Sequence, residues 1–291
     1  MYPSRFRYEA PHSLDEAIEL LRDNGDEGKV LAGGQSLLPL MKLRFASPEM
    51  LVDINNIPGL DYHRVAFDGT LRIGALCRHG DLERSALLRT TQPTMAAAAP
   101  LIADPMVRNR GTLVGSLCHA DPQGDWASVV MALGGHVVAQ GAAGRRNIPV
   151  ADFVTGPFQN AMEPSEIAVE AVIPAGDGNA RGGYLKLERR VGDFATVGVA
   201  VAVDVSGDRV SRAGIALTGV GPATIGATAA GAALVGKPLS ADAIEEAASL
   251  AAEASKPRSD HRGSATFKRH MVHTFVHRLL SRVNETEQRA A

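Results

Sequence analysis

The chain has 291 residues, of which 45% are hydrophobic and 21% charged, as is ordinary for a globular protein large enough for two domains. Its 30 basic and 32 acidic residues give a net charge of −2, which offers no electrostatic support for general nucleic-acid binding. The sequence has no run of 18 apolar residues and no signal-peptide pattern, so we expect a cytoplasmic protein without a membrane span.

The first predicted element is a helix. Ser13 and Glu16 have the spacing of a capping box, apolar residues follow at helical spacing, and Gly25 is a stop signal. A short buried strand over 29–32 then leads into Leu31–Pro39, which we call the first glycine segment. We expect this segment to form a turn directly after the strand.

The next elements lead to a second segment of the same kind. Strands are predicted over 50–54 and 71–74, a helix begins near residue 80, and an alanine-rich helix over 94–103 ends at Asp104-Pro105. Arg108–Leu117, the second glycine segment, is also interpreted as a turn after an apolar strand.

The middle of the chain ends at a predicted linker. A helix is expected over 126–133, a strand over 137–140, and a turn with a short strand around 148–153. An apolar stretch over 167–173 follows. Residues 175–179 are all small or turn-forming, so we place a domain boundary there.

The chain after this linker is predicted to form an α+β module. Three antiparallel strands are predicted over 183–189, 195–205 and 209–217, and two helices over 240–254 and 266–283. Ser206-Gly207-Asp208 between the last two strands is typical of a hairpin turn. These elements indicate a small sheet backed by helices.

The two glycine segments contain the material of an anion site. Glycine lets the backbone approach a phosphate closely, and successive amides can then point into one concavity. Thr112 and Ser116 add hydroxyl donors in the second segment, and Asp125 could accept from a ribose hydroxyl or cap the following helix. Each segment alone could also be a plain loop turn. Two of them point to a bound dinucleotide, although no Rossmann fingerprint and no P-loop is present.

The sequence gives little support for a metal site or for cysteine chemistry. Cys77 and Cys118 are the two cysteines, whereas an iron–sulfur cluster normally takes four ligands, so any cluster in the system would lie on another chain. His273 and His277 lack the glutamate of a zinc-protease motif, and we predict no metal site. Basic clusters at 186–190 and 268–277 are interpreted as solvated faces or subunit contacts.

Four motifs together resemble one known family. Residues 32–44 resemble the first FAD-binding motif of the medium subunits of molybdenum hydroxylases, the xanthine dehydrogenase family, with the aerobic carbon monoxide dehydrogenase flavoprotein as the closest type. Residues 108–116, with 119–122, resemble the second motif. Residues 189–195 and 215–221 resemble motifs of that family's C-terminal domain. The motifs occur in order over nearly the whole chain.

The resemblance implies the architecture. Residues 1–176 would form an α+β FAD-binding domain of the vanillyl-alcohol-oxidase (PCMH) type, with subdomains of about 1–57 and 58–176. Residues 177–291 would form the C-terminal domain of the carbon monoxide dehydrogenase flavoprotein type, a small antiparallel sheet with helices.

The resemblance also implies a set of FAD-binding residues and no catalytic residue. The pyrophosphate would lie between the two glycine segments, with Asp125 near the ribitol–adenosine portion. The adenine would lie beside the 167–168 pair and the flavin ring near Lys186 and Phe194. The full set is Ala32, Gly33, Gly34, Gln35, Ser36, Leu37, Thr112, Gly115, Ser116, Asp125, Ile167, Ala168, Lys186 and Phe194.

Two positions depart from the family pattern. Val114 stands where the second motif usually has glycine, and binding is expected to survive if its side chain faces away from the phosphates. Phe194 stands where related subunits often have tyrosine, so it can stack but cannot donate a hydrogen bond.

The implied function is electron transfer within a larger enzyme. FAD on this chain would take electrons from iron–sulfur clusters and pass them to an external acceptor. The implied partners are a large molybdopterin-binding subunit and a small [2Fe-2S] subunit, assembled as a dimer of heterotrimers. A free-standing flavin oxidoreductase of the same fold and a flavin-free binding module are the alternatives.

Overall fold

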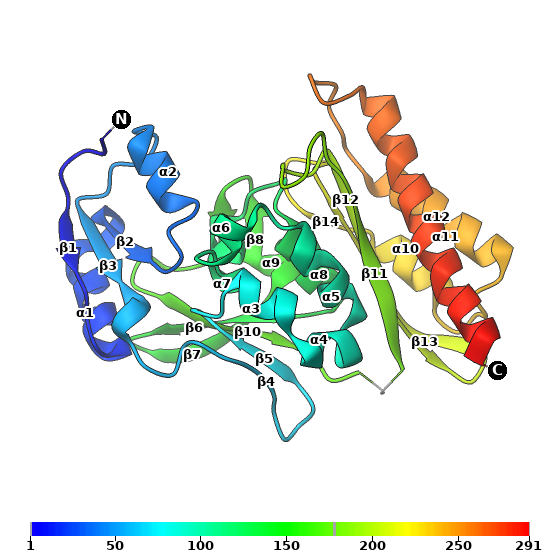
Figure 1. The fold of residues 1–291 in the computed structure, drawn as a ribbon, viewed down its shortest axis with the longest axis horizontal. Helices are drawn as coiled ribbons and strands as arrows, with labels where there is room; N and C mark the ends of the chain where they lie inside the picture. The colour runs from blue at the N-terminus through cyan, green and yellow to red at the C-terminus, as the bar shows by residue number, and fades with distance from the viewer. Residues whose placement is uncertain (1, 177–178, 291) are drawn as a thin grey trace.

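The structure, a computed structural model, describes residues 2–176 and 179–290. Asp177 and Gly178 of the predicted linker lie outside the described residues. Three larger sheets with their helices follow one another along the chain, from blue through green to red in Figure 1, and a fourth sheet has two short strands, β8 (Val154–Gly156) and β9 (Gln159–Asn160). We call residues 2–57 the N-terminal unit, 58–176 the central unit and 179–290 the C-terminal unit.

The N-terminal unit is a three-stranded parallel sheet with two helices. In chain order it consists of β1 (Arg7–Glu9), α1 (Leu14–Asn24), the 3-10 turn η1 (Gly25–Glu27), β2 (Gly28–Leu31), α2 (Leu37–Lys42), β3 (Met50–Asp53) and the 3-10 turn η2 (Ile54–Asn56). The strand order is β1-β3-β2, and α1 packs on β2 and β3. Ser13 caps α1 as predicted, but the Glu16 carboxylate accepts from the N–H of His12 rather than of Ser13, so only half of the capping box forms.

The central unit is a five-stranded antiparallel sheet covered by short helices. Its elements are β4 (His63–Val65), β5 (Leu71–Gly74), α3 (His79–Arg84), α4 (Ala86–Thr91), α5 (Pro93–Ala98), η3 (Ala99–Leu101), α6 (Pro105–Arg108), α7 (Leu113–His119), α8 (Asp125–Ala132), β6 (His136–Gly141), β7 (Gly144–Pro149), α9 (Val150–Phe153), β8 (Val154–Gly156), β9 (Gln159–Asn160) and β10 (Ile167–Ile173). The order β4-β5-β10-β6-β7 places β10 in the middle. Every residue of β10 is buried, which explains why six of its seven residues are apolar; the exception, Glu170, pairs with Arg72 at 2.8 Å.

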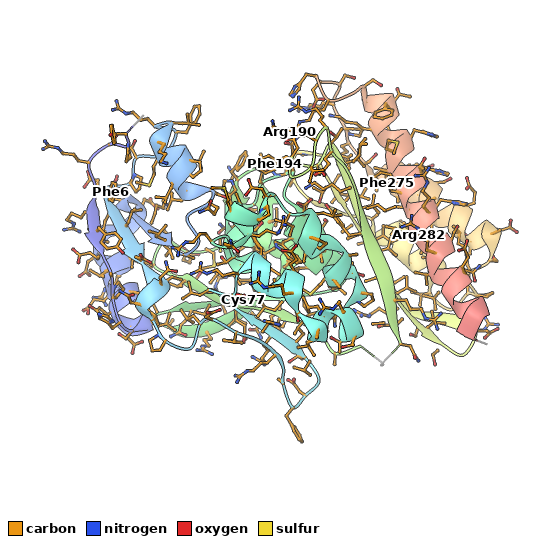
Figure 2. All side chains as sticks on the ribbon, viewed as in Figure 1. Phe6, Cys77, Arg190, Phe194, Phe275 and Arg282 are labelled. Carbon is orange, nitrogen blue, oxygen red and sulfur yellow. The ribbon has the colours of Figure 1, made fainter. Side chains whose placement is uncertain are left out.

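The C-terminal unit is the predicted small antiparallel sheet backed by helices. Its elements are β11 (Ala180–Leu187), β12 (Val197–Ser206), β13 (Arg209–Thr218), β14 (Ile225–Gly226), α10 (Thr228–Leu234), α11 (Ala241–Ala254) and α12 (Ala265–Ala290). The order β11-β12-β13-β14 confirms the three predicted antiparallel strands. Phe275 of α12 lies in the core between the helices and the sheet (Figure 2).

Alternation along β12 decides what each face of this sheet contacts. The valines at alternate positions 197–205 belong to the core shared with α10, α11 and α12. Ala200 and Ala202 point to the opposite face, into the core shared with α5 and α8 of the central unit. Small residues are needed there, because a Cβ on Gly214 of β13 would lie 1.8 Å from the carbonyl oxygen of Ala132. The C-terminal sheet is therefore the common wall of two cores.

Several local predictions are wrong. The second glycine segment does not follow a strand: α6 precedes it and α7 begins within it. The predicted helix over 94–103 is divided into α5 and η3, and Val150–Phe153 forms the helix α9 rather than a strand. The side chains of Lys186 and Lys268 are buried with their ammonium groups paired, so these two lysines are not part of a solvated face, and the alternative of a subunit contact stays a prediction. Within the described residues, no helix is long and apolar enough to cross a membrane.

Candidate functional site

One cavity of about 750 Å³ lies where the N-terminal unit, the helices of the central unit and the β11–β12 loop meet. Its volume is in the range of cofactor sites. Every residue in the predicted FAD-binding set lines it: Ala32, Gly33, Gly34, Gln35, Ser36, Leu37, Thr112, Gly115, Ser116, Asp125, Ile167, Ala168, Lys186 and Phe194. Folding therefore brings these distant parts of the sequence around one cavity, while their individual contacts with FAD stay predictions.

The first glycine segment presents unpaired backbone donors to this cavity. It turns the chain between β2 and α2, and Gly34 has a φ of +73°, which glycine adopts at least cost. Within the described residues, the N–H groups of residues 33–37 have no hydrogen-bond acceptor. Consecutive unpaired amides on a cavity wall are the donor set that a pyrophosphate requires. The segment thus fits an anionic ligand.

The two glycine segments touch through their backbones. A Cβ on Gly33 would lie 2.4 Å from the carbonyl oxygen of Arg110 and 2.8 Å from the Cα of Gly111. In the second segment Thr112 caps α7, its hydroxyl accepting from the N–H of Gly115 at 3.0 Å. A Cβ on Gly115 would lie 2.6 Å from that hydroxyl oxygen. Close approach of backbone atoms, rather than positive φ, requires glycine at position 33, whereas at position 115 an added Cβ would displace the Thr112 hydroxyl that caps α7.

Val114 packs into the protein core at the edge of the candidate cavity, which it also lines. It is in the first turn of α7, its side chain is 2% exposed, and it belongs to the large core of the N-terminal and central units. Its backbone is helical, a conformation that does not need glycine. The valine therefore serves packing, and its β-branch is compatible with the turn it occupies.

Replacing Val114 by glycine is expected to lower the free energy of unfolding by about 3 kcal/mol, because a buried side chain is lost and glycine weakens the helix. FAD affinity should change less than threefold. Urea unfolding of the FAD-free protein and an FAD titration of the same sample measure both quantities. Tighter FAD binding at unchanged stability would contradict the packing role.

Asp125 belongs to a buried polar cluster. The N-cap of α8 is Gly124, so the predicted capping role of Asp125 is wrong. Its carboxylate accepts from the hydroxyl of Tyr184 at 2.6 Å and from the ammonium of Lys186 at 3.1 Å. Lys186 donates also to the carbonyl oxygen of Leu101 at 2.9 Å, and 1% of its side chain is exposed. Burial raises the pKa of Asp125, while Lys186 and Tyr184 oppose that rise.

Phe194 forms part of the cavity rim on the loop between β11 and β12 (Figure 2). Its side chain is 51% exposed. The N–H of Phe194 donates to Asp193, and Arg262 both pairs with Asp193 at 3.2 Å and donates to the carbonyl oxygen of Phe194. Burial would raise the pKa of Asp193, but the hydrogen bonds from Phe194, Arg189 and Arg262 lower it to about 2. The C-terminal unit thus fixes the loop that carries Phe194.

Sequence reasoning missed His79, which lines the same cavity. Its Nδ1 accepts from the indole N–H of Trp126 at 3.0 Å, so the ring proton is on Nε2. A Cβ on Gly111 would lie 2.8 Å from that Nε2, so the ring also packs against the second glycine segment. Burial first, and then the neighbouring arginines, lower the pKa of His79 to about 4. No sequence motif distinguishes it, because its contacts are far apart in the chain.

The depressed pKa of His79, about 4 against an ordinary 6.5, predicts acid sensitivity. Between these values the unfolded chain binds the proton and the folded protein does not, so stability is lost as the pH falls. His79 alone should cost about 2 kcal/mol between pH 7 and pH 5. Urea unfolding at both pH values should show a smaller difference for His79→Gln than for the wild type. Equal differences would show that another group titrates.

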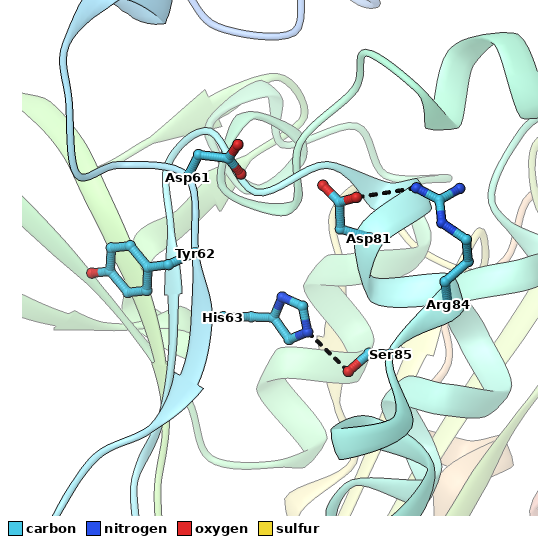
Figure 3. A pocket seen from close by; sticks show the side chains of 6 residues that line it. All are labelled: Asp61, Tyr62, His63, Asp81, Arg84 and Ser85. Atoms are coloured by element: carbon cyan, nitrogen blue, oxygen red, sulfur yellow. Dashed lines mark hydrogen bonds and ion pairs between the residues drawn. The ribbon is translucent and has the colours of Figure 1, made fainter.

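A second hollow, of about 430 Å³, is an open surface feature lined by Asp61, Tyr62, His63, Asp81, Arg84 and Ser85 (Figure 3). Arg84 pairs with Asp81 at 3.1 Å, and the His63 ring bonds the Ser85 hydroxyl at 2.9 Å. Its polar groups largely satisfy one another, and none of the predicted site residues lies there. The larger cavity is therefore the candidate site.

Comparisons with known proteins agree with this geometry. A family model described as the FAD binding domain in molybdopterin dehydrogenase matches residues 4–176, and one described as the CO dehydrogenase flavoprotein C-terminal domain matches residues 183–283. The chain belongs to this family. It is an FAD-binding medium subunit of the molybdenum hydroxylase type, and hence an oxidoreductase subunit.

Individual relatives of this medium subunit match over almost their full length. The carbon monoxide dehydrogenase medium chain of Hydrogenophaga pseudoflava is 42% identical, with 97% of this chain and 98% of the relative covered. The 6-hydroxypseudooxynicotine dehydrogenase complex subunit alpha of Paenarthrobacter nicotinovorans is 38% identical, with 97% and 95% covered. The solved structure of reconstituted CO dehydrogenase from Oligotropha carboxidovorans superimposes with a TM-score of 0.94 at 34% identity, covering 98% and 99%.

The medium subunit's own residues fit its FAD cofactor. The unpaired amides at 33–37 suit the pyrophosphate, and the close approach at Gly33 and Gly115 leaves the backbone accessible where side chains would obstruct it. The buried pair at the start of β10, Ile167 and Ala168, offers an apolar wall of the kind that an adenine ring contacts.

Proposed function

We propose that this medium subunit is the electron-transfer subunit of a heteromeric molybdenum hydroxylase. Electrons would pass from iron–sulfur clusters on a small subunit through FAD to an external acceptor. The observation that carries the proposal is the single cavity that unites both glycine segments with Lys186 and Phe194. FAD supplies the redox chemistry when bound, and the protein supplies position and electrostatics.

Different residues would bind different parts of the cofactor. The N–H groups of residues 33–37 would bind the pyrophosphate from the N-terminal unit, and the Thr112–Ser116 turn would close on it from the central unit. Asp125 has lone pairs beyond those that Tyr184 and Lys186 use, so it can still accept from a ribitol or ribose hydroxyl. Phe194, at the cavity rim, would contact the isoalloxazine ring.

The family and this chain's composition support the proposed partners. With two cysteines the chain lacks the four ligands of a [2Fe-2S] cluster, so the clusters would belong to a small subunit and the molybdopterin to a large one. We propose a dimer of such heterotrimers in the cytoplasm. Relatives bear names of different substrates, which agrees with substrate choice on the large subunit.

Affinity purification of the tagged full-length chain from its own cells tests the proposal. We expect FAD, iron and molybdenum to copurify in a ratio of one FAD to four iron atoms to one molybdenum, as two [2Fe-2S] clusters per heterotrimer require. Turnover of a small organic substrate by the isolated chain would instead favour a free-standing flavin oxidoreductase.

A further inference from the structure

A single hydrogen bond connects the N-terminal unit to the rest of the described chain. Arg78 donates from Nη2 to the Oδ1 of Asn55 at 2.6 Å, and no other hydrogen bond or ion pair between described residues crosses from residues 2–57 to residues 58–290. The N-terminal sheet also pairs with no strand of the central sheet. The two units contact mainly through apolar packing, which is not directional.

In the N-terminal unit, Asn55 connects the Arg78–Asn55 bond to the first glycine segment. The Nδ2 of Asn55 donates to the carbonyl oxygen of Ala32 at 2.8 Å. Asn55 is itself oriented by Asp53, whose Oδ1 accepts from the Asn55 N–H at 2.9 Å. Asp53 in turn accepts from the hydroxyl of Tyr8 on β1 at 2.6 Å. Asn55 is therefore a fixed acceptor for Arg78.

On the other side, the same arginine leads to the second glycine segment. Its Nη1 donates to the carbonyl oxygen of Arg110 at 2.7 Å. That oxygen is the atom that a Cβ on Gly33 would meet at 2.4 Å. One planar guanidinium thus bonds to groups fixed to both glycine segments, at the point where their backbones are closest.

These side chains lie behind the cavity wall. Neither Arg78 nor Asn55 nor Arg110 lines the cavity, whereas their bonded neighbours Ala32 and Gly111 do. Arg78 therefore has no direct contact with a cofactor bound in this cavity. Any effect of Arg78 on the cofactor must pass through the spacing of the two backbone segments.

We propose that Arg78 is a positioning residue that fixes the distance between the two glycine segments, and that Asn55 is its partner across the two units. The arginine pre-organises the pyrophosphate site, so that FAD does not have to order the units on binding. This inference rests on the proposed roles of the glycine segments in binding FAD.

The test is an FAD titration of the deflavinated full-length protein. The protein is titrated as it is purified, either alone or together with partner subunits. Arg78→Gln is expected to weaken FAD binding at least tenfold. Arg84→Gln is the matched control: it lies at the far end of the helix that Arg78 precedes, is largely exposed and pairs with Asp81, and it should leave FAD affinity within twofold of wild type. Asn55→Ala should weaken binding several-fold.

The double variant separates positioning from general stability. If Arg78 acts through Asn55, the affinity loss of the double variant is smaller than the product of the two single losses, because both single changes remove the same Arg78–Asn55 bond. The unfolding midpoint of the FAD-free protein should stay close to that of the control. Where Arg78→Gln does not fold, Arg78→Lys tests the same point, because a lysine cannot reach both acceptors as a fork.

Two results overturn the inference: unchanged FAD affinity in Arg78→Gln, whatever its unfolding midpoint, or affinity losses that multiply in the double variant. Failure of the wild-type protein to bind FAD would overturn the proposed function instead. The two failures are thus distinguishable in one series of titrations.

Discussion

Replacing Gly33 by alanine is expected to weaken FAD binding about a hundredfold. The added Cβ would lie 2.4 Å from the carbonyl oxygen of Arg110 and 2.8 Å from the Cα of Gly111, and backbone atoms cannot rotate away as a side chain can. The two glycine segments must then separate. Overpacking of this kind costs about 3 kcal/mol, which corresponds to the stated loss of affinity. Equilibrium titration of the deflavinated protein with FAD measures it.

Gly59→Ala is the control for this substitution. Gly59 has a φ of +76°, and a Cβ added to it would meet no atom within 4 Å, so alanine there strains the backbone without moving either glycine segment. It should cost about 1 kcal/mol of stability and leave FAD affinity unchanged. Equal losses of affinity in both variants would show that the close contact at Gly33 is not what shapes the site.

Replacing Asp125 by alanine is expected to lower the free energy of unfolding by about 4 kcal/mol, because a buried ammonium that loses its partner is costly. The change removes the carboxylate that accepts from Lys186 and Tyr184, and the Lys186 side chain is 1% exposed. Glu188, 3.4 Å from that ammonium, compensates only in part. Because whole domains are stable by about 5–15 kcal/mol, urea unfolding should detect the loss easily.

Further variants separate the effect of losing the buried charge pair from the effect of losing side-chain volume. The double variant Asp125→Asn with Lys186→Met removes both charges at similar volume, and it should recover part of the stability that Asp125→Ala loses. Asp125→Asn alone should be intermediate. A double variant less stable than Asp125→Ala would mean that packing or the tyrosine bond, rather than the buried charge, dominates.

Local sequence patterns predicted many of the secondary-structure elements correctly. The helix capped by Ser13, the strands that became β2, β3 and β5, and the three antiparallel strands of the C-terminal unit are confirmed. Each depends on periodicity or capping chemistry that neighbouring residues encode. The predicted strand before the second glycine segment is wrong, because Asp104 and Thr112 each cap a short helix and a local apolar run does not distinguish the two states.

The sequence by itself identified the family, because its motifs are contiguous and their chemistry depends on residue type, and it predicted residues that line the candidate cavity. Only the tertiary structure decided that Asp125 pairs with Lys186, that Val114 packs into the core, and that Arg78 joins Asn55 to the second segment. These contacts connect residues far apart in the chain. Their energies arise from burial and distance, which exist only once the units have packed together.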